Sequence, residues 1–99
     1  MNRELIKNVL NEVRTSIFTL KISIDKNNKE TAFFEFGIVI GMLNTLLWLT
    51  DNDQKIYSIK QKTLDLYQAY KLGTIDLKQV KEKLTNLEIE LKCIEEKGA

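Results

Sequence analysis

The chain has 99 residues, 43% of them hydrophobic and 29% charged, and its 15 basic and 14 acidic residues leave a net charge of +1. A chain of this length forms one domain, and the balanced charge supplies no bulk attraction to nucleic acid or to an anionic membrane. The sequence has no His and a single Cys, Cys93. The commonest general base and metal ligand is therefore missing, and neither an intrachain disulfide nor a thiolate zinc cluster can form. We expect no enzyme activity, no cofactor and no metal.

The first part of the chain has the pattern of a helix and also that of a strand. Hydrophobic residues recur at helical spacing as far as Ile24, which predicts a helix over residues 3–24. From Phe18 to Asp25, however, apolar and polar residues alternate strictly, as they do in a strand. A turn-prone stretch and a β-branched run follow, so a β-hairpin over residues 18–40 is the alternative. We predict the helix, because an isolated two-stranded sheet is marginal unless helices cover it.

The middle of the chain is its most apolar part. The run from Phe33 to Leu49 would be apolar on nearly all sides of a helix, which indicates burial on more than one face. Asp51 and Gln54 then have the spacing of a capping box, which predicts a break. The hydrophobic residues on both sides stay in heptad phase, so one helix over residues 31–72 is the alternative. We predict two helices or a bent one, because a capping residue competes with continued helix.

Two regular helices follow the break. The first ends near Gly73, a residue suited to the left-handed conformation at a helix terminus. The second is predicted over residues 76–96, with Thr74 or Asp76 as its cap. Because the connection over residues 72–75 is short, the two helices should pack as an antiparallel hairpin. The apolar seam of the first helix consists of Ile56, Ile59, Thr63, Leu66 and Tyr70, and that of the second of Leu77, Val80, Leu84, Leu87, Leu91 and Ile94.

Together these elements predict an all-α bundle of three or four helices with an antiparallel C-terminal hairpin. The β-hairpin over residues 18–40 would make the fold α+β instead. The two C-terminal helices can cover each other, whereas the apolar run has only the helix over residues 3–24 to cover it. We therefore expect a second copy to cover the rest, which gives a homodimer. One unpaired thiol and an amino terminus without the order of a secretory signal predict a cytoplasmic protein.

Five residues are candidates for an interaction surface. Gly37 and Gly41 lie one helical turn apart and would let another helix approach closely, either in a partner or within the bundle itself. Trp48, Tyr57 and Tyr67 combine a large apolar area with a polar tip, and such residues are frequent anchors of interfaces. Tyr57 and Tyr67 fall off the seam of their helix, which favours a place on the surface.

Other functions for these segments are weaker. The apolar run has about 17 residues, fewer than the ~20 needed to cross a membrane, and it carries Glu35. Glu35 and Asn44 could hold a ligand in the bundle centre, but polar groups in such runs more often lie at the bundle edge. Ala69 and Gly73 have the spacing of a helix-turn-helix, yet the following helix mixes Lys with acidic residues. We therefore expect neither a membrane span nor DNA binding.

Residues 37–49, Gly-Ile-Val-Ile-Gly-Met-Leu-Asn-Thr-Leu-Leu-Trp-Leu, resemble a helix of small helical accessory proteins of phages and prophages. That resemblance implies a non-enzymatic protein that works by binding, for instance by inhibiting a host or defence protein. The prediction is a protein-binding regulator or inhibitor with an unidentified protein partner. One alternative is a helical oligomer that sequesters a small ligand, such as a nucleotide, at a subunit junction lined by Lys, Asn and Tyr. The other is a DNA-binding regulator.

Overall fold

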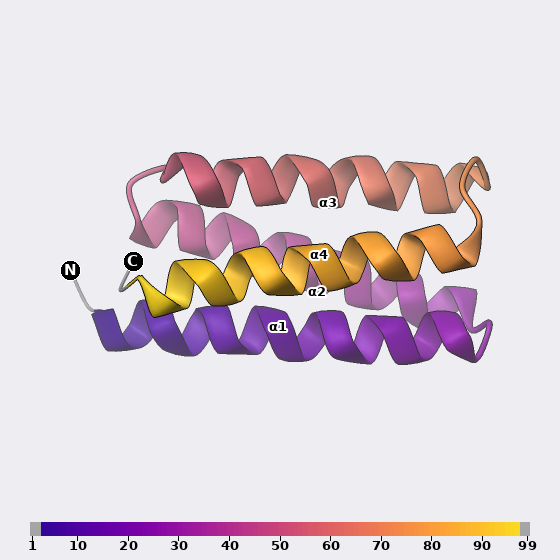
Figure 1. The fold of residues 1–99 in the computed structure, drawn as a ribbon, viewed down its shortest axis with the longest axis horizontal. Coiled ribbons are helices and arrows are strands. Elements are labelled where there is room, and N and C mark those ends of the chain that lie inside the picture. The colour runs from indigo at the N-terminus through magenta and orange to yellow at the C-terminus, as the bar shows by residue number, and fades with distance from the viewer. Residues whose placement is uncertain (1–2, 98–99) are drawn as a thin grey trace.

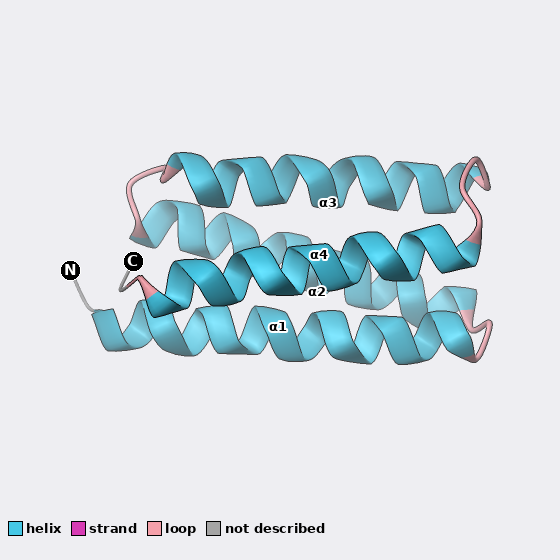
Figure 2. Ribbon diagram, in the orientation of Figure 1, coloured by secondary structure: helices cyan, strands magenta, loops and turns pink. Residues whose placement is uncertain are grey.

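The computed structural model describes residues 3–97, which form four α-helices joined by short connections (Figures 1 and 2). Over these residues there is no strand, so the prediction of an all-α bundle is confirmed with four helices. The β-hairpin alternative over residues 18–40 is wrong. The bundle is elongated, with extents of 39 × 20 × 20 Å. Its helices are α1 (Arg3–Asp25), α2 (Lys29–Leu49), α3 (Gln54–Leu72) and α4 (Leu77–Glu96).

The four helices occupy the corners of the bundle, and each packs against two neighbours. Helix α1 contacts α2 and α4, and α3 contacts the same two helices, so that α2 and α4 are diagonal to each other. Figure 1 shows α3 and α4 running in opposite directions, as the predicted hairpin requires. One cluster of buried hydrophobic residues, drawn from all four helices, fills the centre.

The helical pattern prevails over the strand pattern in α1 because it buries a complete row of side chains. Within the alternating segment, Leu20 and Ile24 belong to this row, whereas Phe18 and Ile22 stay exposed. A strand would have placed all four on one face. After α1, Asn27 turns the chain with a φ of 55°, and the side chain of Asn28 accepts a hydrogen bond from the Thr31 amide at 3.1 Å to begin α2. The buried row of α1 consists of Ile6, Leu10, Val13, Ile17, Leu20 and Ile24.

The break after the apolar run is confirmed, and the continuous helix over residues 31–72 is wrong. The capping residue is Asp53 rather than Asp51. The Asp53 carboxylate accepts hydrogen bonds from the amides of Lys55 at 2.9 Å and Ile56 at 3.1 Å. Asp51 and Asn52 have φ values of 55° and 63°, so they reverse the chain in left-handed conformations before α3 begins.

The C-terminal hairpin follows its predicted signals closely. Gly73 adopts a φ of 70° and ends α3, a conformation that glycine tolerates without a steric penalty. Of the two candidate caps of α4, Asp76 accepts a hydrogen bond from the Gln79 amide at 2.8 Å. Every predicted seam residue of α3 is buried, and so is every one of α4 except its first residue, Leu77, which is exposed.

Candidate interaction surface

The side of α2 that faces away from the bundle is uncharged and uncovered. Phe34 is 67% exposed and Trp48 is 82% exposed. Gly37 and Gly41 lie between them and are exposed as well. Since these residues are three, four and seven positions apart, they form one stripe along the helix. We call this stripe the α2 outer face, and its members are Phe34, Gly37, Gly41, Asn44, Thr45 and Trp48.

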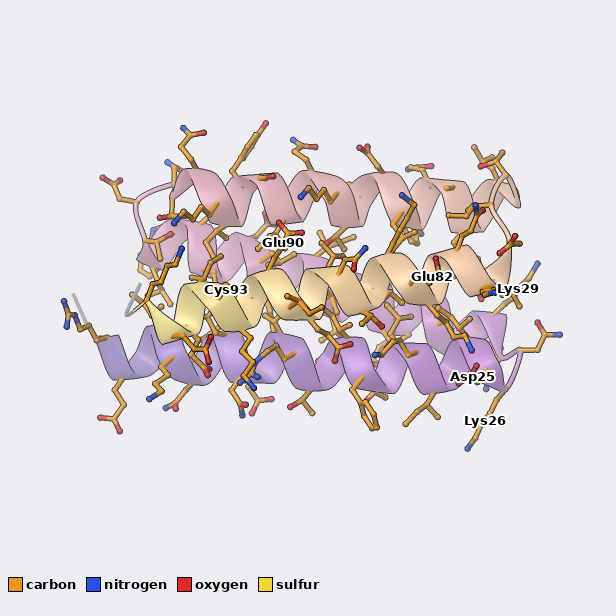
Figure 3. All side chains as sticks on the ribbon, in the orientation of Figure 1. Asp25, Lys26, Lys29, Glu82, Glu90 and Cys93 are labelled. Atoms are coloured by element: carbon orange, nitrogen blue, oxygen red, sulfur yellow. The ribbon has the colours of Figure 1, made fainter. Side chains whose placement is uncertain are left out.

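Charge is absent from this face and concentrated elsewhere. No Asp, Glu, Lys or Arg occurs over residues 36–50. Among residues 3–97, each ion pair has one member on α4. Figure 3 shows one of these members, Glu90, on the side of α4 that faces α3. The pairs are Arg14 with Glu95, Lys21 with Glu88, Lys62 with Glu90, and Asp25 with Lys81.

The two glycines of α2 do not mark a close helix crossing within the bundle. A Cβ atom built on Gly37 or on Gly41 would have no neighbour within 4 Å. The sequence left two predictions open for this glycine pair, a close contact with a partner and a close contact within the bundle. The prediction of a contact within the bundle is wrong. A glycine in a helix interior costs roughly 1 kcal/mol relative to Ala, and no close packing inside the single chain offsets this cost.

The two aromatic residues expected on the surface near the α2–α3 connection are exposed. Trp48 lies in the last turn of α2 and Tyr57 in the first turn of α3, so both are at the same end of the bundle. Tyr57 is 47% exposed, and its hydroxyl accepts a hydrogen bond from the Gln61 side chain at 2.8 Å. These two side chains thus have the accessibility that an interface anchor needs.

Tyr67 does not lie free on the surface as expected, because its side of α3 faces α2. It is partly buried, with its ring 6.0 Å from that of Phe33 in an edge-to-face arrangement and 5.3 Å from that of Phe36. Tyr70 completes this cluster at 5.5 Å from Phe33 and is buried, as its seam position predicted. Burial raises the pKa of the Tyr70 hydroxyl. Both tyrosines stabilise the core between α2 and α3.

The polar residues of the apolar run lie at the edge of the bundle. Asn44 is exposed and Glu35 is half-buried, so neither points into the buried cluster. A ligand site in the bundle centre is therefore wrong for these two residues. Within residues 3–97, no group of three or more Cys, Asp or Glu side chains is placed to hold a metal ion.

Phe34 belongs to this surface although it was not among the five predicted residues. Its signal was available, because Phe34 is three residues before Gly37 and two heptads before Trp48. Large hydrophobic side chains are also exposed on other helices. On α1, Phe18 is 57% exposed and Ile22, one turn later, is 39% exposed, and Ile89 on α4 is 57% exposed. The α2 outer face differs from these because two glycines lie between its aromatic residues and because it holds Trp48, the most exposed of these side chains.

A groove of about 490 Å³ runs between α3 and α4. Its polar rim includes Lys62, Asp65, Lys83 and Glu90. The Lys62 ammonium binds both carboxylate oxygens of Glu90, at 2.9 and 3.1 Å. The two positive and two negative side chains balance, so the groove has no net charge that would attract an anion such as a nucleotide.

By length and composition, α2 could also cross a membrane, and it is the only helix of residues 3–97 with this property. A third of its most apolar 18-residue window is buried inside the bundle. The core helix of a soluble bundle has the same composition. The expectation that α2 does not span a membrane stays a prediction.

No protein-family model, no curated protein and no solved structure matches this chain. The resemblance of residues 37–49 to phage and prophage accessory proteins therefore stays a prediction.

Proposed function

We propose that this protein is a non-enzymatic binding protein that regulates or inhibits another protein by docking the α2 outer face on it. The observation that carries the proposal is the uncovered stripe between Phe34 and Trp48, exposed along the helix whose opposite side buries residues in the core. Burying apolar surface is the main favourable term in protein association, at roughly 25 cal/mol per Å².

The chemistry of the stripe supports a protein surface as its target. A large, rigid aromatic residue such as Trp48 is typical of the few residues that dominate binding energy. Because residues 36–50 carry no charge, a partner can cover them without desolvating an ion. The helix is held in place by its buried side, so little conformational entropy is lost when the outer side is covered.

The alternative functions have less support. Sequestration of a nucleotide in the α3–α4 groove would require Lys62 to leave Glu90, and Asp65 would repel the phosphates. DNA binding would require a basic face, yet the 15 basic residues are balanced by 14 acidic ones, and α4, the second helix of the helix-turn-helix reading, mixes both signs. Protein binding through α2 needs no such rearrangement.

Affinity capture with three baits tests the proposal. The baits are the wild type, the Trp48→Lys variant and the matched control Ile89→Lys, which places the same charge on an exposed hydrophobic position of α4. We expect a protein from the source cell extract that the wild type and Ile89→Lys retain and Trp48→Lys loses. Retention of the same proteins by all three baits would exclude the α2 outer face as the binding surface.

A nucleotide-dependent rise in melting temperature, lost in Lys83→Ala, would instead support the groove, because a ligand that binds only the folded state stabilises it. Lys83 suits this test because it lines the groove and belongs to none of the ion pairs described above.

A further inference from the structure

The groove between α3 and α4 has a defined length. At one end the Lys62 ammonium reaches across from α3 and binds the Glu90 carboxylate of α4 at 2.9 Å. At the other end Ile75, in the α3–α4 connection, lines the groove. The volume of about 490 Å³ between these ends lies in the range of small-molecule sites, which often form between the helices of bundles.

The floor of this groove is apolar. Leu66 of α3 and Leu87 of α4 are its most buried lining residues, each 3% exposed. Ala69 and Ile75 also line it but are only partly buried, so some apolar surface remains open to solvent there. A ligand with an apolar body would remove this surface from water, which favours its binding.

Three polar side chains on the walls of the groove have no partner in the described part of the chain. They are Asp65 on α3 and Lys83 and Asn86 on α4. None of them forms an ion pair or a side-chain hydrogen bond with another of residues 3–97. A ligand in the groove therefore meets one free carboxylate, one free ammonium and one free amide.

These free groups disfavour ligands that carry only one sign of charge. An anion would be attracted by Lys83 and repelled by Asp65, and for a cation the two effects would be reversed. A molecule with both an ammonium and a carboxylate is complementary to the two side chains at once. Hydrogen bonds between charged groups are also shorter and stronger than those between neutral ones.

The register of the two helices gives the spacing of the two charges. Lys62 pairs with Glu90 across the antiparallel helices, so Ala69, seven residues after Lys62, lies about level with Lys83, seven residues before Glu90. Asp65 is four residues before Ala69, which places it about 6 Å from the level of Lys83 along the groove. An extended dipeptide spans about 7 Å, whereas a single amino acid carries both charges on one carbon atom.

From these observations we infer that the α3–α4 groove binds a short zwitterionic peptide with hydrophobic side chains. The ammonium of the peptide binds Asp65, its carboxylate binds Lys83, and its side chains cover Ala69 and Ile75. Asn86 lies between the levels of Asp65 and Lys83, where its amide can donate a hydrogen bond to the peptide group and accept one from it. No residue of α2 lines this groove, so the inference does not rest on the proposed function.

Nuclear magnetic resonance of the full chain tests the ligand class, with the dipeptide leucylphenylalanine as the probe. We expect saturable shifts of the backbone amides over residues 65–69 and 83–87. The N-acetyl form and the methyl ester each lack one charge and should bind about tenfold more weakly, and glycylglycine, which has no hydrophobic side chain, should not saturate. No saturable shift below ~10 mM, or equal affinities of the dipeptide and its two blocked forms, would overturn the inference. Saturation by adenosine triphosphate but not by the dipeptide would overturn it too.

Matched variants test the two charged residues. Asp65→Asn should weaken binding of the dipeptide about tenfold without weakening that of the N-acetyl form, and Lys83→Gln should do so without weakening that of the methyl ester. Both side chains are exposed, so these variants keep the fold. The controls Asp51→Asn and Lys92→Gln make the same chemical changes outside the groove and should bind as the wild type does. Unchanged binding in either wall variant, or an equal loss in the controls, would refute the assignment.

Discussion

Helices α2 and α4 lie at diagonal corners of one bundle, and they differ in what they present to solvent. Helix α4 buries one apolar stripe and surrounds it with the charged residues that form the ion pairs to α1 and α3. Helix α2 also buries one stripe but leaves uncharged aromatic and glycine residues outside. Apart from Leu77 and Ile89, the exposed surface of α4 is therefore largely charged or polar, whereas that of α2 includes an uncharged stripe with two aromatic residues. This difference is the basis on which we propose the α2 outer face as the binding surface.

The largest effect is expected where the two helices are alike, in the buried core. Phe36→Ala on α2 should lower the free energy of unfolding by about 3–5 kcal/mol, and Leu84→Ala on α4 by about 2–5 kcal/mol, since each leaves a cavity where the side chain is 0% exposed. Denaturant unfolding at a fixed protein concentration measures both. A change below about 1 kcal/mol at either position would contradict the buried cluster.

The next largest effect should distinguish the exposed side of α2 from that of α4. Trp48→Ala should weaken binding of the captured partner by about 2 kcal/mol, roughly 30-fold in Kd, because it removes an aromatic anchor. The same variant should leave the stability of the monomer within about 0.5 kcal/mol, since the side chain is 82% exposed. The control Ile89→Ala on α4 should change neither quantity. Titration with the captured partner gives the Kd, and equal effects of the two variants would remove the distinction between the helices.

The glycines should give effects of opposite sign on folding and on association. Gly37→Ala and Gly41→Ala should each stabilise the monomer by about 1 kcal/mol, because Ala favours helix and its Cβ meets nothing. The added methyl group should hold a partner away from the α2 backbone, so Gly41→Ala should raise the Kd of the captured partner. Thermal unfolding at high dilution measures the first effect and titration with the partner the second, and light scattering checks the homodimer that the sequence predicts. A monomer destabilised by either change would contradict the open geometry of α2.

A smaller effect is expected for the ion pairs of α4. Glu95→Gln should lower the free energy of unfolding by less than about 1 kcal/mol, because the pair with Arg14 is only partly buried. The difference from the wild type should shrink in about 1 M salt, where the Debye length is ~3 Å. Chemical unfolding at low and high salt checks this. Retention of the full effect in salt would indicate a structural role of Glu95 beyond its charge.

The smallest effect concerns alkaline pH. Burial raises the pKa of Tyr70 in the folded state, so its contribution to stability is fully present below the unfolded value of about 10 and is lost as pH rises through the folded pKa. Tyr70→Phe should lose less stability than the wild type between pH 9 and about pH 11. Unfolding curves over that range give the comparison, and Lys titration is common to both proteins. Parallel pH profiles would contradict the burial of the hydroxyl.

Much of the fold could be predicted from the chain because most of its helices have a single apolar stripe. The seams of α3 and α4 each admit one buried direction, so their positions and the C-terminal hairpin follow from spacing alone. In α1 the strand pattern of Phe18–Asp25 competed with the helical one, and the burial of a complete row of side chains decided between them. The sequence predicts the cap of α3 at Asp51, whereas the structure has it at Asp53. The difference arises because Asp51 and Asn52 adopt left-handed conformations and reverse the chain before α3 begins. Such a turn leaves no periodic signal.

The candidate surface was predicted less completely. Gly37, Gly41, Trp48 and Tyr57 are exposed as an interface requires, whereas Tyr67 packs against Phe33 and Phe36. The position of a residue off the seam does not say whether that flank faces a neighbouring helix or water. Phe34 was missed for the same reason.

The sequence by itself determined an all-α bundle of three or four amphipathic or apolar segments, the C-terminal hairpin and the absence of charge over residues 36–50. Only the tertiary structure decided which side of α2 is buried, because hydrophobic residues lie at nearly every angle around that helix. Packing against α1 and α3 takes Phe36, Val39, Leu43 and Leu46 into the core and turns Phe34 and Trp48 outward. A hydrophobic pattern specifies which side of a helix is buried when the hydrophobic residues concentrate on one side. In α2 they do not, so the packing against α1 and α3 determines which side is buried.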